Sequence, residues 1–173
     1  NKIEELPEGM LDDLVNLETF YAGSNLIAAI PEGFFKNNSK VTWVNLSSNL
    51  IASIDAGDLT GLSSVTELDF GNNAIASVDK AAFEGLGAVT SLALNGNQLT
   101  SLSDGVFAPL KTVTFLNLDD NQLAALPSSI GSMESLSWLS ASRNQLTSLD
   151  TVDFSGLEAL ANVDLSSNQI TEL

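Results

Sequence analysis

The chain of 173 residues contains no cysteine and no histidine. It therefore lacks the thiol nucleophile and the imidazole general base on which many enzymes depend. No glycine-rich phosphate loop or nucleophile elbow is present in the sequence. We therefore predict that the protein is not an enzyme and has no catalytic residues.

Basic residues are also scarce, because six lysines and arginines face 22 acidic residues and leave a net charge of −16. A field of this sign repels phosphate backbones and anionic lipid surfaces, so we expect no nucleic-acid partner. No apolar run approaches the roughly 18 residues of a membrane span, so we expect no direct membrane insertion of this segment.

Asparagine, in contrast, recurs at a fixed interval. From Asn1 onward the interval is 24 residues, except for 23 residues between Asn121 and Asn144. Apolar residues keep the same offsets around each asparagine, as in "VTWVNLSSNLIASI", "VTELDFGNNAIASV" and "VTSLALNGNQLTSL". Such a period indicates an array of stacked units in which each repeat contacts only its neighbours.

This pattern resembles the leucine-rich repeat family of the 24-residue extracellular type, with the consensus LxxLxLxxNxLxxL. The stretch "NQLTSLSDGVFAPLKTVTFLNLDDNQLAALP" is especially similar to repeats of vertebrate receptor ectodomains and variable lymphocyte receptors. The resemblance implies an α/β solenoid: a right-handed coil with a concave parallel β-sheet of about seven strands. It implies a convex side of loops and short helical turns.

The repeat covers the whole chain, so we predict one solenoid over residues 1–173. The predicted units are a partial repeat 1–16, repeats 17–40, 41–64, 65–88, 89–112, 113–135 and 136–159, and a partial repeat 160–173. We expect a piece of a longer protein without end caps. Extracellular members of the family usually carry disulfide-bonded caps, so the missing cysteines indicate either lost caps or a reducing compartment.

Two columns of side chains are predicted to hold the coils together. The ladder asparagines should bond backbone groups where each coil turns, because an unpaired buried polar group costs about 1–3 kcal/mol. They are Asn25, Asn49, Asn73, Asn97, Asn121, Asn144 and Asn168. A spine of aromatic side chains, Phe35, Phe83, Phe107 and Phe154, is predicted beneath the convex side.

Alternate residues of each strand should point to the concave face. Both tryptophans of the chain fall in one column of that face, and exposed aromatic side chains are typical binding anchors. The predicted binding residues are Tyr21, Trp43, Asn45, Glu67, Asp69, Phe115, Asn117, Asp119, Asp120, Trp138 and Arg143. The rings of Trp43, Phe115 and Trp138 are expected to emerge together, with Phe115 and Trp138 as neighbours. Alternatively, these aromatics only stabilise the sheet or pack against another domain.

The acidic residues of this face, including Asp69, Asp119 and Asp164, lack the spacing of a calcium loop and lie on different coils. We therefore predict no metal site and no cofactor. Small residues recur in pairs after the ladder, as at Ala28–Ala29 and Ala52–Ser53. They either fit a tight turn or form a flat strip for lateral self-assembly or assembly with other chains.

These observations predict a non-catalytic interaction module of a secreted or cell-surface protein, which binds a protein or glycan partner by its concave face. The alternative is a structural or adhesive subunit, or a spacer, in an extracellular assembly or filament.

Overall fold

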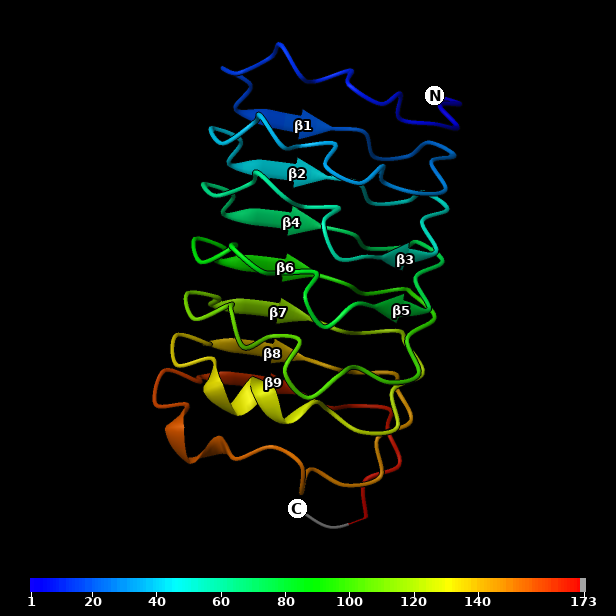
Figure 1. The fold of residues 1–173 in the computed structure, drawn as a ribbon. Coiled ribbons are helices and arrows are strands. Elements are labelled where there is room, and N and C mark those ends of the chain that lie inside the picture. Colours follow the sequence, from blue (N-terminus) through cyan, green and yellow to red (C-terminus); the bar gives the residue numbers. More distant parts are fainter. Residues whose placement is uncertain (172–173) are drawn as a thin grey trace.

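The fold is a stack of coils, seen in a computed structural model that describes residues 1–171. Each coil contributes one three-residue strand to a parallel sheet: β1 (Thr19–Tyr21), β2 (Trp43–Asn45), β4 (Glu67–Asp69), β6 (Ser91–Ala93), β7 (Phe115–Asn117), β8 (Trp138–Ser140) and β9 (Asn162–Asp164). The sheet order is β1-β2-β4-β6-β7-β8-β9, so each strand lies beside that of the next coil (Figure 1). The predicted solenoid with a sheet of about seven parallel strands is confirmed.

The core lies behind this sheet, and the alternation of the sequence decides which side chains enter it. The eight predicted inward side chains are Val44, Leu46, Leu68, Phe70, Leu92, Leu94, Leu116 and Leu118, and each is at most 1% exposed. Full burial of one such side chain contributes about 1.5–3 kcal/mol. Repetition of this small contribution along the stack stabilises the solenoid.

The return path of each coil has little regular structure. Two-residue strands β3 (Ser53–Ile54) and β5 (Ser77–Val78) pair in parallel where two of the coils turn back (Figure 1). Later coils carry the 3₁₀ helices η1 (Ser128–Ser132) and η2 (Phe154–Gly156). The expectation of loops and short helical turns on this side is confirmed.

The one-residue deletion between Asn121 and Asn144 falls in the coil that contains η1. Ile130 and Met133 both remain fully buried there. The strands on either side keep their register, with Phe115 opposite Trp138. The return path therefore absorbs the missing residue, and the columns of the sheet are not shifted.

Asn49 shows how the ladder asparagines join successive coils. Its Nδ2 donates to the carbonyl of Leu46 in its own coil at 3.0 Å and to that of Ala22 in the preceding coil at 2.9 Å. Its Oδ1 accepts from the backbone N–H of Ile27 at 3.0 Å. Each of the seven ladder asparagines donates within its own coil and accepts from the preceding coil. Five are buried, whereas Asn73 and Asn168 are half-buried.

The residue before each ladder asparagine adopts a positive φ. These residues are Ser24, Ser48, Asn72, Gly96, Asp120, Arg143 and Ser167, with φ between 52° and 66°. A left-handed conformation costs a non-glycine residue about 1–2 kcal/mol, so the coil imposes it at the turn that brings the asparagine inward. Asp120 and Arg143 occupy equivalent turns of adjacent coils, which places their side chains next to each other.

The predicted aromatic spine forms in part. Phe35, Phe83 and Phe107 are fully buried, and the rings of Phe83 and Phe107 stack with their centroids 6.1 Å apart. Leu59 and Ile130 fill the intervening coils of the column. Phe154 departs from the prediction, because it is only partly buried. The reason is that no return path within residues 1–171 stacks on its outer side.

Candidate interaction face

The outer face of the sheet, which is the solvent side of the seven strands, carries two columns of side chains. The first column is Thr19, Trp43, Glu67, Ser91, Phe115, Trp138 and Asn162, and the second is Tyr21, Asn45, Asp69, Ala93, Asn117, Ser140 and Asp164. Tyr21 is 57% exposed, Trp138 is 43% exposed and Trp43 is 39% exposed. Phe115 is half-buried. Large rings therefore meet solvent on an otherwise polar surface.

The aromatic residues form two separate pairs. Phe115 and Trp138 lie on adjacent strands with ring centroids 6.2 Å apart, so these two are neighbours as expected. Trp43 does not join them; it contacts Tyr21 edge-on, with centroids 5.1 Å apart and planes at 89°. All three rings emerge on this face, as expected, although β4 and β6 lie between β2 and β7 and separate Trp43 from the other two.

Smaller and acidic side chains lie between the two aromatic pairs. Glu67 lies directly beside Trp43, and Ser91 follows it in the same column. Three strand-to-strand steps of about 4.8 Å separate Trp43 from Phe115, or about 14 Å along the stack. The outer face thus has two aromatic patches, Tyr21 with Trp43 and Phe115 with Trp138, and an acidic stretch with smaller side chains between them.

Three predicted binding residues, together with Asp164, also support their own turns. The Oδ1 atoms of Asn45, Asp69, Asn117 and Asp164 accept hydrogen bonds from the backbone N–H two residues later, at 2.9–3.1 Å. Asparagine and aspartate side chains favour such turns. For Asp164, the bond from the Ser166 backbone is the main reason that its pKa lies below the usual value. This turn-supporting role was not predicted from the sequence. Its signal was the presence of Asn or Asp at the same strand position in four of the seven coils.

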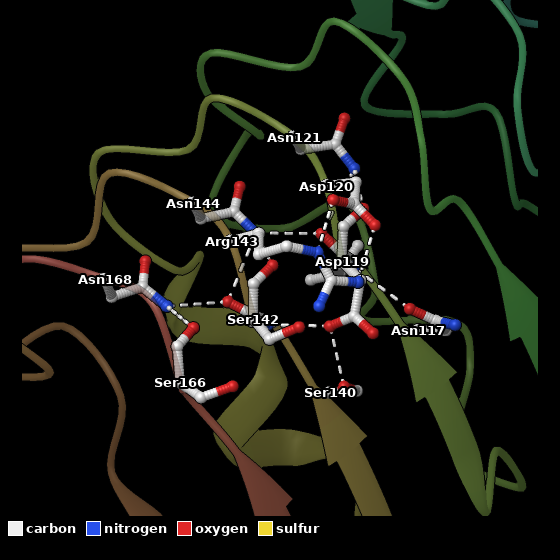
Figure 2. A network of polar contacts seen from close by, with 12 residues as sticks. Asn117, Asp119, Asp120, Asn121, Ser140, Ser142, Arg143, Asn144, Ser166 and Asn168 are labelled. Atoms are coloured by element: carbon white, nitrogen blue, oxygen red, sulfur yellow. Dashed lines mark hydrogen bonds and ion pairs between the residues drawn. The ribbon is translucent and has the colours of Figure 1, made fainter.

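Asp119 replaces the missing carboxylate of the next coil. Ser140 occupies the turn-supporting position of that coil, and its hydroxyl donates to Asp119 Oδ1 at 2.7 Å. The backbone N–H of Ser142 donates to the same oxygen at 2.7 Å (Figure 2). Asp119 therefore binds two groups of the neighbouring coil, and part of its function is structural.

Asp120 and Arg143 form an ion pair on the outside of this network. Arg143 Nη2 donates to Asp120 Oδ2 at 2.6 Å, and Nε donates to Oδ1 (Figure 2). The hydrogen bond from the guanidinium lowers the pKa of Asp120. Both side chains are about half exposed, so we expect the pair to contribute little to stability.

Negative charge dominates the face. Its columns and the positions that flank them hold one arginine, Arg143, and six carboxylates: Glu18, Glu67, Asp69, Asp119, Asp120 and Asp164. Glu18, Glu67 and Asp164 are exposed without an ion-pair partner within residues 1–171, and of these three Glu67 is the one that lies between the aromatic patches. The face therefore favours a ligand of positive charge.

A hydroxyl column borders the sheet at the residue before each strand. The side chains of Thr42, Thr66, Thr90, Thr114 and Ser137 donate to the backbone carbonyl of the equivalent residue one coil earlier, at 3.0–3.1 Å. These hydroxyls therefore join successive coils at the start of each strand, as the asparagine ladder does after its end.

The groups that this face presents to a ligand are aromatic rings and carboxylates. Residues 1–171 contain no group of three acidic side chains placed to hold a metal ion. The helices of this part of the chain, η1 and η2, are short, and neither has the length and hydropathy that a bilayer span requires. The carboxylates lie on an open sheet, where water is not excluded.

The small-residue strip lies on a different flank of the coils. Ser53 and Ser77 of this strip take part in the pairing of β3 with β5, which supports the simpler interpretation that small residues fit the turn. Nearby, Leu26 and Leu50 are 38% and 52% exposed and border a hollow. Lateral assembly through this flank remains a prediction.

The sequence matches the leucine rich repeat family over residues 17–75, 63–123 and 126–170. A search of curated protein sequences finds no match. Similar solved structures include a chain of the Drosophila Toll–Spatzle complex, at 25% identity and a TM-score of 0.62, which covers 96% of this chain and 29% of that one.

Two further structures are similar over almost the whole chain. A chain of the octameric complex of Latrophilin 3, Unc5D and FLRT2 has 25% identity and a TM-score of 0.83, covering 98% of this chain and 52% of that one. A chain of the TLR13–ssRNA13 complex has 22% identity and a TM-score of 0.89, covering 99% of this chain and 24% of that one. The present chain thus spans about a quarter to a half of each. The last of these complexes contains RNA, so the fold alone does not exclude a nucleic-acid partner. By its repeat pattern and the extent of the family match, the chain belongs to the leucine-rich repeat family.

Proposed function

We propose that this chain is a non-catalytic recognition module of a secreted or cell-surface protein, and that it binds a protein partner by the outer face of its sheet. One observation carries the proposal: both tryptophans of the chain are about 40% exposed on that face, and each is paired with a second aromatic ring. Exposed aromatic pairs with a polar surround are typical of binding anchors.

The comparisons support a protein ligand. Two of the similar structures are complexes between proteins, namely Toll with Spatzle, and FLRT2 with Latrophilin 3 and Unc5D. A glycan is the second ligand class that aromatic rings and carboxylates suit. An RNA ligand is disfavoured here by the charge of this face, on which one arginine stands against six carboxylates.

A mutational experiment tests the use of this face. The triple variant Trp43→Ala, Phe115→Ala, Trp138→Ala is screened beside the wild type against arrays of purified secreted proteins and of glycans. Interactions of the wild type should be lost in the variant, while its melting temperature changes little because the rings lie outside the core. Leu50→Ala, on the exposed flank, is the matched control and should bind like the wild type. Retained binding by the triple variant would contradict the proposal, and a large loss of melting temperature would assign the rings to stability.

The alternative function, a structural subunit or spacer, is favoured by one observation. Leu26 and Leu50 expose aliphatic surface beside small residues on the flank of the coils. Sedimentation over a range of concentrations separates the two functions. A monomer that binds a partner in a 1:1 ratio supports recognition, whereas growth into polymers that Leu50→Lys prevents would support lateral assembly.

A further inference from the structure

We propose that the outer face binds an extended, basic peptide segment of its partner, which places one apolar side chain on each aromatic pair and a lysine or arginine over Glu67. This inference rests on the proposed function and defines the chemistry of its ligand. The segment would run across the strands, along the axis of the stack.

The spacing of the two aromatic pairs favours an extended ligand. Their inner rings, Trp43 and Phe115, are three strand steps or about 14 Å apart along the stack. In an extended peptide, side chains four residues apart point to the same side and are separated by about 13 Å. In a helix, side chains on one face lie about 10.5 Å apart at seven residues, about 12 Å at eight and about 16.5 Å at eleven, at a rise of 1.5 Å per residue. The extended spacing of about 13 Å therefore comes nearest to the distance between the inner rings.

The middle side chain of such a segment meets the acidic stretch. The residue two positions after the first anchor points to the same side as both anchors, because the side chains of a strand alternate. It would lie between β4 and β6, where Glu67 is opposite Ser91 and Asp69 is opposite Ala93. The small side chains of Ser91 and Ala93 leave room for a long basic residue.

Glu67 is the carboxylate best placed to meet this residue. Its side chain is exposed, and no basic group pairs with it within residues 1–171. The neighbouring Asp69 is already occupied, because Oδ1 accepts from the Gly71 backbone at 2.9 Å and Oδ2 accepts from Asn45 at 3.3 Å. Asp120, near the other aromatic pair, is engaged by Arg143.

The chain provides its own reporters for a test. It has two tryptophans, and each belongs to a different aromatic pair. The two indole N–H signals in a ¹H–¹⁵N spectrum therefore report the two patches separately, and Trp43→Phe and Trp138→Phe assign them without removing an aromatic ring.

The probes are synthetic peptides of glycine and serine with phenylalanine at the first and fifth positions of a five-residue core and lysine at the third. Matched peptides carry glutamate in place of lysine, or phenylalanines only two residues apart. The lysine peptide should shift both indole signals with one common Kd, and the glutamate peptide should bind about five- to tenfold more weakly. Glu67→Gln should remove most of that preference, whereas Glu84→Gln, an exposed charge on the return path, should not.

The outcomes separate this inference from the proposed function. Four outcomes would overturn the two-anchor segment while leaving the face as a binding surface. Two concern the indole signals: only one of them responds, or the two give different Kd values. The other two concern the peptides: lysine and glutamate peptides bind equally, or the closely spaced peptide binds more tightly. Peptide binding that moves neither indole, or no binding at millimolar peptide, would overturn the segment. Peptide binding that moves neither indole would also count against the proposed function, whereas a lack of binding to these peptides would not.

Discussion

The side-chain oxygen of Asn97 accepts a hydrogen bond from the backbone N–H of Ile75, in the preceding coil, with 3.0 Å between the two atoms. The same amide donates through Nδ2 to the carbonyls of Phe70 and Leu94 at 3.1 and 3.0 Å. Both coils depend on this one side chain, because neither can pair these buried backbone groups by itself.

We therefore expect Asn97→Ala to lower the free energy of unfolding by about 2–3 kcal/mol, since it leaves the buried N–H of Ile75 without a partner. Urea denaturation followed by circular dichroism measures the change. The neighbouring exposed amide provides the control, and Gln98→Ala should stay within about 0.5 kcal/mol of the wild type. Equal losses for the two variants would mean that the ladder adds no stability of its own.

Asp119 should act on stability through its oxygen rather than its charge. Asp119→Ala removes the acceptor for the buried Ser142 N–H and should cost about 1–3 kcal/mol. Asp119→Asn keeps an acceptor oxygen and should cost clearly less. Chemical denaturation of both variants tests this difference. Similar losses for alanine and asparagine would show that charge, and not the hydrogen bonds, is what this position requires.

Asp58 should make the protein less stable as pH rises. Burial raises the pKa of this carboxyl, the hydrogen bond from the Asp55 backbone opposes that rise, and the nearby carboxylates of Asp55 and Glu32 add to it. The folded state thus binds the proton more tightly than the unfolded state. The contribution is fully present below the unfolded pKa of about 3.9 and is lost as pH rises through the higher folded pKa.

Asp58→Asn removes this dependence while keeping an oxygen that can accept from the Asp55 N–H. The variant should be more stable than the wild type at pH 7, and the difference should shrink toward pH 3. Urea midpoints across this range provide the measurement. Asp150→Asn, which removes an exposed charge elsewhere, controls for net charge. A gain that is as large at pH 3 as at pH 7 would rule out the burial of charge as its cause.

Glycine is required at position 61 by a close approach of two backbones. A Cβ there would lie 2.1 Å from the carbonyl oxygen of Phe35, and the residue has a φ of +100°. We expect Gly61→Ala to cost more than about 3 kcal/mol or to prevent folding, because backbone atoms of the preceding coil cannot move aside.

Two other glycines separate the cause of that loss. Gly85 also has a positive φ, of +81°, but its Cβ would meet nothing within 4 Å, so Gly85→Ala should cost about 1–2 kcal/mol. Gly105 has neither constraint, and Gly105→Ala should be neutral or stabilise by up to about 1 kcal/mol. Thermal melts of the three variants should follow this order. If Gly61→Ala melted no lower than Gly85→Ala, the close approach would not matter.

Much of the architecture follows from local patterns. The alternation at Val44 and Leu46 is enough to place both side chains in the core, because successive residues of a strand point to opposite faces. The deletion before Asn144 could also be located from the spacing. The burial of Phe154 could not be predicted in this way, because it depends on which residues stack against its ring.

The amino-acid sequence by itself determined the coil, its register, and which side chains face the core or the solvent, since these depend on a fixed period that every repeat obeys. Only the tertiary structure decided that Tyr21 turns toward Trp43, that Asp119 serves the next coil, and that Glu67 is left without a partner. These features depend on how neighbouring coils meet. They depend on rotamers and on competition for hydrogen bonds, which become defined only when the coils are stacked.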